Sequence, residues 1–302
     1  MGDLCAGRVV IVTGAGRGIG RAHAMAFAAE GAAVVVNDLG AGLDGSASGE
    51  NPAAEVVADI VAAGGRAVVN GDDVADWEGA RRLVATAINH FGRLDVLVNN
   101  AGFLRDRMLA TMSETEWDAV VRVHLKGHFA PLRHAVEYWR AQSKAGIPVD
   151  GRVINTSSGA GLQGSVGQGN YAAAKAGIAA LTLNAAAEFA RYGVTVNAIA
   201  PAARTRMTET TFAASMARPE SGFDAMAPEN VSPLVVWLGS AESRDITGRV
   251  FEVEGGKISV ADGWRHGPAT DKGARWMPDE LGTVVPRLVD KAVPAEPVYG
   301  AI

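Results

Sequence analysis

Cysteine is almost missing from this chain of 302 residues, and Cys5 is the only one. A disulfide within the chain is therefore excluded, and one cysteine fits the reducing cytoplasm, where we expect the protein. No uncharged apolar run reaches the roughly 20 residues that a membrane-spanning helix needs. The first residues enter a strand-like pattern without the basic and apolar regions of a signal peptide. We therefore expect a soluble protein.

Positive charge is also in short supply. The chain has 28 Lys and Arg against 33 Asp and Glu, which gives a formal net charge of -5. A general nucleic-acid-binding protein usually has a basic surplus, so this class is disfavoured. Internal repeats and low-complexity tracts are missing as well. The hydrophobic share of 48% is ordinary for a globular protein, and the length allows one large α/β domain or two small ones.

Short apolar runs alternate with helix-like stretches along most of the chain. Strands are predicted at Val9–Val12, Ala33–Val36, Ala67–Val69, Leu94–Val98, Arg152–Asn155, Val194–Ile199 and Arg249–Val253. Helices are predicted at Ile19–Glu30, Ala53–Ala63, Trp77–His90, Glu114–Arg140 and Tyr171–Arg191. This alternation predicts an α/β fold with a parallel sheet and helices on both faces. The strands are apolar throughout, as expected when both faces of the sheet are covered.

Two stretches depart from this rhythm. Leu39–Pro52 is rich in Gly, Ser and Asp and follows a strand, which predicts an exposed loop. The residues after Trp264 hold several prolines, show little periodicity and are too few for a domain. We therefore divide the chain into a main domain, residues 1–263, and a C-terminal tail, residues 264–302. The tail is expected to pack on the body or on a neighbouring subunit.

A glycine-rich turn joins the first predicted strand to the first predicted helix. It reads Thr13-Gly14-Ala15-Gly16-Arg17-Gly18-Ile19-Gly20. Glycines let the backbone approach phosphates closely, and a helix N-terminus offers N–H groups and a positive dipole end to a pyrophosphate. No Gly-Lys-Ser/Thr follows, which excludes a P-loop. A turn without a ligand is the alternative, but the strand–turn–helix context favours a dinucleotide. Residues 1–263 are thus assigned as a dinucleotide-binding and catalytic domain.

Asp38 ends the second predicted strand, eighteen residues after Gly20. An acid at this place accepts hydrogen bonds from the adenosine ribose hydroxyls and repels a 2′-phosphate, which favours NAD over NADP. Arg17 in the turn can serve a phosphate, so NADP stays open. An aspartate that only starts the following loop is the other interpretation.

Polar residues also follow the third and fourth predicted strands. Asp73-Val74 follows the third strand, and Asn99-Asn100-Ala101-Gly102 follows the fourth. Both lie at carboxyl ends of strands, where ligands bind in open parallel sheets. Each alone is compatible with a simple turn. Together with the glycine-rich turn they predict the adenine edge and the central wall of a cofactor cleft.

Tyr171 and Lys175 are four residues apart, so their side chains share one face of a helix. A phenol is a poor base at its usual pKa of about 10, and a nearby ammonium should lower that pKa. The phenol can then act as a general acid or base near neutral pH. Ser158, at the end of the preceding strand, can donate a hydrogen bond to a substrate oxygen. A lone Tyr-x-x-x-Lys is common, but Ser158 and the glycine-rich turn favour the catalytic reading.

From about Arg8 to about Gly256 the chain resembles a short-chain dehydrogenase/reductase. The resemblance implies a single doubly wound, Rossmann-type domain, an NAD(P) cofactor, and a catalytic set of Ser158, Tyr171 and Lys175. In such an enzyme Tyr171 exchanges a proton with the substrate oxygen, Lys175 also holds the nicotinamide ribose, and Ser158 orients the carbonyl. The resemblance further implies a homo-oligomer, a tetramer or a dimer, formed through Glu114–Arg140 and Tyr171–Arg191.

Two departures from the family pattern concern the site. A fourth catalytic residue is usually Asn and holds a water in a proton relay, whereas this chain has His124. A histidine could relay protons, but its pKa would make the step pH-sensitive. The usual Pro-Gly after the sixth strand reads Pro201-Ala202 here. The resemblance implies that this loop lines the nicotinamide site and that Thr205 contacts the carboxamide.

His124, the segment Asn37-Asp38-Leu39-Gly40 and the segment Arg206-Met207-Thr208 resemble one branch of the family. That branch is the (3R)-hydroxyacyl-CoA dehydrogenase unit of type 2 multifunctional β-oxidation enzymes, with its bacterial relatives. It implies NAD-dependent interconversion of a secondary alcohol and a ketone, on a 3-hydroxyacyl-CoA or a steroid-like lipid. An NADPH-dependent 3-oxoacyl carrier-protein reductase is disfavoured by Asp38. A cofactor-binding protein without catalysis is disfavoured by the complete Ser–Tyr–Lys set.

The predicted site contains catalytic and cofactor-binding residues but no metal. His124 and His128 are four apart, yet no third residue nearby has ligand-like spacing. Arg105, Arg107, Arg204 and Arg206 either meet the phosphates of a CoA thioester or lie on the surface. The predicted catalytic residues are Ser158, Tyr171, Lys175 and His124. The predicted cofactor-binding residues are Gly14, Arg17, Gly18, Ile19, Gly20, Asp38, Asp73, Val74, Asn100, Ala101, Gly102, Tyr171, Lys175, Pro201 and Thr205.

Overall fold

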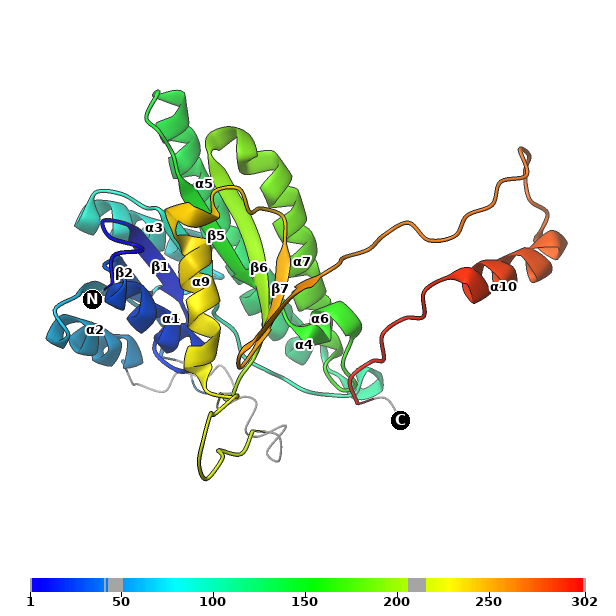
Figure 1. The fold of residues 1–302 in the computed structure, drawn as a ribbon, viewed down its shortest axis with the longest axis horizontal. Coiled ribbons are helices and arrows are strands. Elements are labelled where there is room, and N and C mark those ends of the chain that lie inside the picture. Colours follow the sequence, from blue (N-terminus) through cyan, green and yellow to red (C-terminus); the bar gives the residue numbers. More distant parts are fainter. Residues whose placement is uncertain (1, 41, 43–50, 206–215, 301–302) are drawn as a thin grey trace.

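The fold is built on one twisted sheet of eight strands. Figure 1 shows the sheet with helices packed around it. The computed structural model describes residues 2–40, 42, 51–205 and 216–300. The strand order is β3-β2-β1-β4-β5-β6-β7-β8, and the order reverses between β1 and β4. The bounds are β1 Val9–Thr13, β2 Ala33–Asn37, β3 Arg66–Asn70, β4 Val96–Asn99, β5 Gly151–Thr156, β6 Val194–Ala202, β7 Val250–Glu254 and β8 Lys257–Ala261.

The first seven strands pair in parallel, which confirms the prediction of a parallel sheet. The eighth strand, β8, runs antiparallel to β7 at the edge of the sheet and was not predicted. Its alternate residues Ile258 and Val260 are exposed, so it lacks the continuous apolar run of a strand covered on both faces.

Helices cover both faces of the sheet, as predicted. Their bounds are α1 Gly18–Ala29, α2 Pro52–Ala62, α3 Trp77–Phe91, α4 Glu114–Val121, α5 Gly127–Lys144, α6 Gly159–Gln163, α7 Gly169–Phe189, α9 Ser232–Gly239 and α10 Leu281–Lys291. Residues of α1, α2 and α9 pack in one apolar cluster, and residues of α3, α5 and α7 pack in another. Alternate residues of β1 feed the two clusters, Val10 and Val12 one, Val9 and Ile11 the other.

The single helix predicted at Glu114–Arg140 is interrupted. Ser113 and Glu116 form a capping box that begins α4. Between α4 and α5 the residues Arg122–Lys126 form one π-helical turn. Single π turns inside helices occur often at functional sites. This one carries His124.

The stretch after β8 contrasts with the rest of the chain. None of the described residues 262–300 is buried, and Trp264 is fully exposed. Figure 1 shows this stretch and α10 standing away from the body, with only the last part returning to it. Packing of the tail on a neighbouring subunit therefore stays a prediction. Not one of the described helices combines the length and the apolar character needed to cross a membrane.

The loop predicted at Leu39–Pro52 falls mostly outside the described residues, and Pro52 is the first residue of α2. Residues Arg206, Met207 and Thr208, which entered the resemblance to one branch, also lie outside the described residues.

Candidate active site

A cavity with a volume of about 960 Å³ lies at the carboxyl ends of the parallel strands. It includes the point between β1 and β4 where the strand order reverses, the place at which open α/β sheets bind ligands. Every predicted catalytic residue and every predicted cofactor-binding residue lines this cavity. The structure thus brings together residues that lie almost two hundred positions apart in the sequence, from Gly14 to Thr205.

The glycine-rich turn is too closely packed for a side chain at Gly14, which lies against the loop after β4, and at Gly20. Gly14 has a φ of 60°, and a Cβ atom there would lie 2.8 Å from the Cα of Ala101. A Cβ at Gly20 would lie 2.2 Å from the carbonyl oxygen of Gly14. The side chain of Arg17, at the N-cap position of α1, makes no capping hydrogen bond to the described helix. The first turn of α1 therefore presents its N–H groups at the cavity, as a pyrophosphate site requires.

Asn100 lines the cavity but serves the turn itself. Its Nδ2 donates to the carbonyl oxygens of Thr13 (3.0 Å) and Gly14 (3.2 Å). Thr13 Oγ1 in turn accepts from the backbone N–H groups of Asn100 (2.9 Å) and Ala101 (3.1 Å). These bonds fix the glycine-rich turn to the loop after β4. The structure therefore gives Asn100 a structural role beside its predicted place in the wall of the cavity.

Three carboxylates, Asp38, Asp72 and Asp73, line the cavity on its β2 and β3 side. Asp38 accepts from the N–H of Gly16 at 2.9 Å with one oxygen, and from the N–H of Gly40 at 2.8 Å with the other. Asp38 is thereby held at the cavity wall at the end of β2. Asp73 forms an ion pair with Arg122 (2.6 Å), which ties the loop after β3 to the π-helical turn.

Ser158, Tyr171 and Lys175 form one polar group at the end of β5 and the start of α7. Ser158 is the N-cap residue of α6, and its Oγ accepts from the N–H of Ala160 (3.2 Å). A side-chain hydrogen bond links Tyr171 with Ser158. The Lys175 Nζ lies 5.4 Å from the centre of the Tyr171 ring and donates to the carbonyl oxygen of Thr156 (2.6 Å). Phenol, hydroxyl and amine thus meet at the cavity wall.

Burial controls the protonation of this group in the chain alone. Burial raises the pKa of Tyr171, the hydrogen bond with Ser158 acts in the opposite direction, and the charge of Asp106 adds to the rise. Burial also lowers the pKa of Lys175 to about 7. In the chain by itself the net shift of the Tyr171 pKa is upward, so the lowering of that pKa by Lys175 stays a prediction. Both charged forms are penalised by the same loss of water.

His124 holds the backbone after β4. It is 2% exposed, and its Nε2 lies 2.8 Å from the carbonyl oxygen of Phe103. A Cβ atom at Gly102 would lie 2.1 Å from the imidazole, so the ring packs directly on that glycine. Burial lowers the pKa of His124 to about 3, and the charge of Lys175 acts in the same direction. The ring is neutral at physiological pH, so the predicted pH sensitivity at His124 is wrong.

We expect the His124→Asn variant to lower kcat by about tenfold, because a shorter side chain holds the 102–103 segment less well. The apparent pKa values of the kcat profile between pH 5 and pH 9 should stay unchanged, since His124 does not titrate in that range. The profile of the wild type, the variant and His134→Asn, which lies outside the cavity lining, provides the measurement. An acid limb near pH 6.5 that disappears only in His124→Asn would contradict this account.

Sequence reasoning missed Asn170, which is fully buried beside Tyr171. Its Nδ2 donates to the carbonyl oxygens of Arg105 and Glu116, both at 3.1 Å. Asn170 thus fixes the start of α7 to the loop after β4 and to α4. No local pattern indicates such a residue, because its partners are more than fifty positions away.

Of the four arginines that could meet CoA phosphates, Arg206 lies outside the described residues, and the other three have partners within the protein. Arg204 is buried and forms an ion pair with Asp224, so it does not lie on the surface, and its guanidinium is engaged within the chain. Arg107 is exposed and pairs with Glu116 at 3.1 Å. His128, considered with His124 for a metal, accepts from the N–H of Thr156 at 3.3 Å. Among the described residues, no group of three or more His, Cys, Asp or Glu is placed to hold a metal.

The doubly wound sheet, the glycine-rich turn and the Ser–Tyr–Lys group define a Rossmann-type oxidoreductase. Residues 8–216 match the family described as short chain dehydrogenase. The match spans well over half of the chain, so the protein belongs to this family, whose members use NAD(P). The predicted family and fold class are thereby confirmed.

Known relatives extend this finding. The chain is 46% identical to hydroxyacyl-CoA dehydrogenase ChsB1 of Mycobacterium tuberculosis, over 91% of this chain and 86% of that protein. It is 47% identical to peroxisomal multifunctional enzyme type 2 of Mus musculus, over 83% of this chain but 32% of that longer protein. A crystal structure of a short chain dehydrogenase from Mycobacterium avium superposes with a TM-score of 0.89. That protein is 68% identical, and the match covers 99% of this chain and 100% of that one.

Proposed function

We propose that this protein interconverts a secondary alcohol and a ketone with NAD, and that its substrate is a 3-hydroxyacyl-CoA thioester. The observation that carries the proposal is the group formed by Ser158, Tyr171 and Lys175 on the wall of the large cavity. Relatives named hydroxyacyl-CoA dehydrogenase and multifunctional enzyme support the thioester. A steroid-like lipid alcohol is the second candidate substrate.

The residues present fit a dinucleotide. The N–H groups at the start of α1 would hold the pyrophosphate, and Asp38 would accept from the adenosine ribose hydroxyls. Asp73 and Val74 would flank the adenine, and Lys175 would hold the nicotinamide ribose. Pro201 and Thr205, with Ala101 and Gly102, would line the nicotinamide side.

Tyr171 exchanges the proton in the proposed reaction. In alcohol oxidation its phenolate oxygen takes the hydroxyl proton of the substrate, and in ketone reduction its hydroxyl returns a proton. Ser158 donates a hydrogen bond to the same substrate oxygen and stabilises the negative charge that develops there. The bound oxidised cofactor supplies the hydride acceptor and a positive charge that favours the phenolate.

The preference for NAD rests on Asp38. Its carboxylate is fixed by the N–H groups of Gly16 and Gly40 and cannot turn away without losing both bonds. A 2′-phosphate beside it would meet a like charge. We expect the Asp38→Ala variant to reduce the ratio of kcat/KM for NAD to kcat/KM for NADP by about a hundredfold.

Initial rates with both cofactors measure this ratio. Asp59→Ala provides the control, because Asp59 lies on α2, pairs with Arg21 and does not line the cavity. An equal ratio in the wild type and Asp38→Ala would contradict the assignment. A wild type that prefers NADPH and reduces a 3-oxoacyl carrier protein would favour the alternative reductase.

The substrate is tested with paired (3R)- and (3S)-hydroxyacyl-CoA thioesters, alongside a steroid alcohol. Appearance of NADH at 340 nm gives the rate. We expect turnover of the 3R thioester. Activity on the steroid alone would support the proposed alcohol oxidation but would contradict the assignment of a thioester substrate. No turnover of any alcohol, with NAD bound, would favour a cofactor-binding protein without catalysis.

We also propose a homo-oligomer, a dimer or a tetramer, assembled through α4, α5 and α7. Large apolar side chains on these helices are exposed, namely Trp117, Phe129 and Leu183. In this proposal residues 1–263 form the dinucleotide-binding and catalytic domain, and the tail, residues 264–302, packs on the body or on a neighbouring subunit. A monomeric mass in light scattering would contradict the proposed homo-oligomer. The buried Cys5 fits a cytoplasmic location, which we retain as part of the proposal.

A further inference from the structure

The end of the described chain returns to the cavity. After the exposed stretch that carries α10, the backbone of Tyr299 pairs in parallel with Ser165. The N–H of Val166 donates to the carbonyl oxygen of Tyr299 (2.9 Å), and the N–H of Tyr299 donates to that of Gly164 (3.2 Å). Glu296, Tyr299 and Gly300 all line the cavity. The segment Val298–Gly300 is thus fixed to the loop that joins α6 to α7.

The side chains of this segment pack on glycines next to the catalytic group. A Cβ atom at Gly159 would lie 2.8 Å from the Tyr299 hydroxyl oxygen and 3.0 Å from its ring. A Cβ at Gly164 would lie 3.3 Å from Val298. Gly159 directly follows Ser158 in the chain. The Tyr299 ring therefore lies against the backbone that positions Ser158.

The loop under Tyr299 is fixed from its other side as well. The N–H of Arg107 donates to the carbonyl oxygen of Gly167 (2.7 Å), and Arg107 pairs in parallel with Gln168. Gln168 also donates to Asp106 at 3.0 Å. The loop from Gly164 to Gln168 is thereby held between two segments, one after β4 and one at the tail. A side chain that rests on this loop has a defined position.

The Tyr299 side chain is half-exposed, 47%, and offers a neutral aromatic surface. Burial raises the pKa of its phenol, and the carboxylates of Glu252, Glu254 and Glu296 act in the same direction. All three carboxylates line the same cavity. This side of the cavity mouth favours an apolar carbon skeleton against the ring and disfavours an anionic group such as a phosphate.

We propose that Tyr299 is a specificity-determining residue. Its ring limits the width of the part of the cavity beside Ser158, where the substrate would bind. The ring contacts the carbon skeleton of the substrate next to the reacting carbon. The inference rests on the proposed function, because it takes the Ser158–Tyr171 group as the place where the substrate reacts. It adds a wall that comes from a segment more than a hundred residues after that group.

The test compares a straight 3-hydroxyacyl-CoA with a wide steroid alcohol in the wild type and in Tyr299→Ala. We expect the variant to shift the ratio of the two kcat/KM values about tenfold toward the steroid. Tyr299→Phe should keep the wild-type ratio, and Kd for NAD should stay unchanged in both variants. Val293→Ala is the matched tail control, since Val293 is 92% exposed and does not line the cavity. An unchanged ratio, or an equal loss on both substrates, would overturn the proposal.

Hydrogen exchange separates a failure of this inference from a failure of the proposed function. In a chain that ends at residue 297, the Val166 amide loses its acceptor and should exchange faster than in the full chain. Equal exchange would mean that the segment does not dock, which overturns the proposal whatever the substrate is. If the wild type turned over no thioester, the assignment of a thioester substrate would be wrong. The wild type and Tyr299→Ala would then be compared with a small cyclic alcohol and the steroid alcohol.

Discussion

The Tyr171→Phe variant should lose between about 10²- and 10⁴-fold in kcat, the range attributed to a positioned general acid or base. The change removes one oxygen atom, so the ring still packs edge-on against His124 and the cavity keeps its shape. Binding of NAD should therefore stay within about twofold of the wild type. Single-turnover rates and calorimetric titration with NAD give the two quantities.

Tyr192→Phe serves as the matched control, because Tyr192 lies outside the cavity lining at the end of a short helical turn after α7. It should leave both quantities unchanged. Near-normal turnover in Tyr171→Phe would remove the phenol from the reaction. A parallel loss of NAD binding would show that the substitution disturbs the cofactor side instead.

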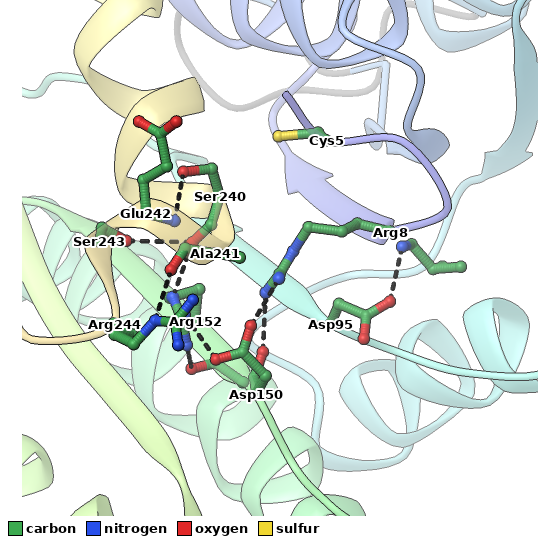
Figure 2. Close-up of polar contacts among 12 residues, drawn as sticks. Cys5, Arg8, Asp95, Asp150, Arg152, Ser240, Ala241, Glu242, Ser243 and Arg244 are labelled. Atoms are coloured by element: carbon green, nitrogen blue, oxygen red, sulfur yellow. Dashed lines mark hydrogen bonds and ion pairs between the residues drawn. The ribbon is translucent and has the colours of Figure 1, made fainter. Parts of the chain in front are cut away.

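The second large effect is expected at the amino ends of the parallel strands, opposite the cavity. Arg152 lies there at the start of β5 (Figure 2) and is 1% exposed. Arg152 donates to Asp150 (2.5 Å) and to the carbonyl oxygen of Ser240 (3.0 Å). Arg8 donates to the same Asp150 carboxylate at 2.7 Å. One network, buried at Arg152 and half-exposed at Asp150, therefore joins Arg8, which precedes β1, to β5 and the end of α9.

Arg152→Ala should lower the free energy of unfolding by about 3 kcal/mol, because the Ser240 carbonyl keeps, among the described residues, only the Ser243 hydroxyl as a donor (3.2 Å) and a cavity remains. Chemical denaturation at neutral pH measures the change. Arg244→Ala is the control, since Arg244 is exposed and donates only at 3.3 Å to the Ala241 carbonyl among the described contacts. A loss below about 1 kcal/mol would mean that Arg152 is held no more strongly than a surface arginine.

The parallel part of the fold is predictable because its strands are buried on both faces. Val9–Val12 is apolar without a break, and the structure extends that strand by only one residue, to Thr13. The π-helical turn at Arg122–Lys126 is not predictable in this way, since its residues keep the helical apolar pattern on both sides. The helix α10 was not predicted either, because the tail after Trp264 shows little clear periodicity, and this helix buries no residue.

The candidate site is predictable where a local motif carries it. Gly14 lies in the turn of a strand–turn–helix unit, and Asp38 follows the next strand. Tyr171 and Lys175 share one face of a helix. The pKa values of the site residues are not predictable in this way. Those of Tyr171 and His124 depend on burial, which the spacing of residues in the sequence does not reveal. Tyr299 is also beyond local patterns, since its partners lie more than a hundred residues earlier.

Burial of Lys175 links the stability of the chain without cofactor to pH. The pKa of this amine is about 7 in the folded chain, against about 10.4 for an unfolded lysine. Between these values the unfolded chain binds one proton more, so stability rises with pH from about 7 to about 10. Below pH 7 the folded chain bears the full penalty of a buried ammonium. The thermal midpoint should therefore be higher at pH 9 than at pH 7, and Lys175→Met should flatten this dependence. The residue that we propose to serve the reaction thus lowers the stability of the fold that carries it.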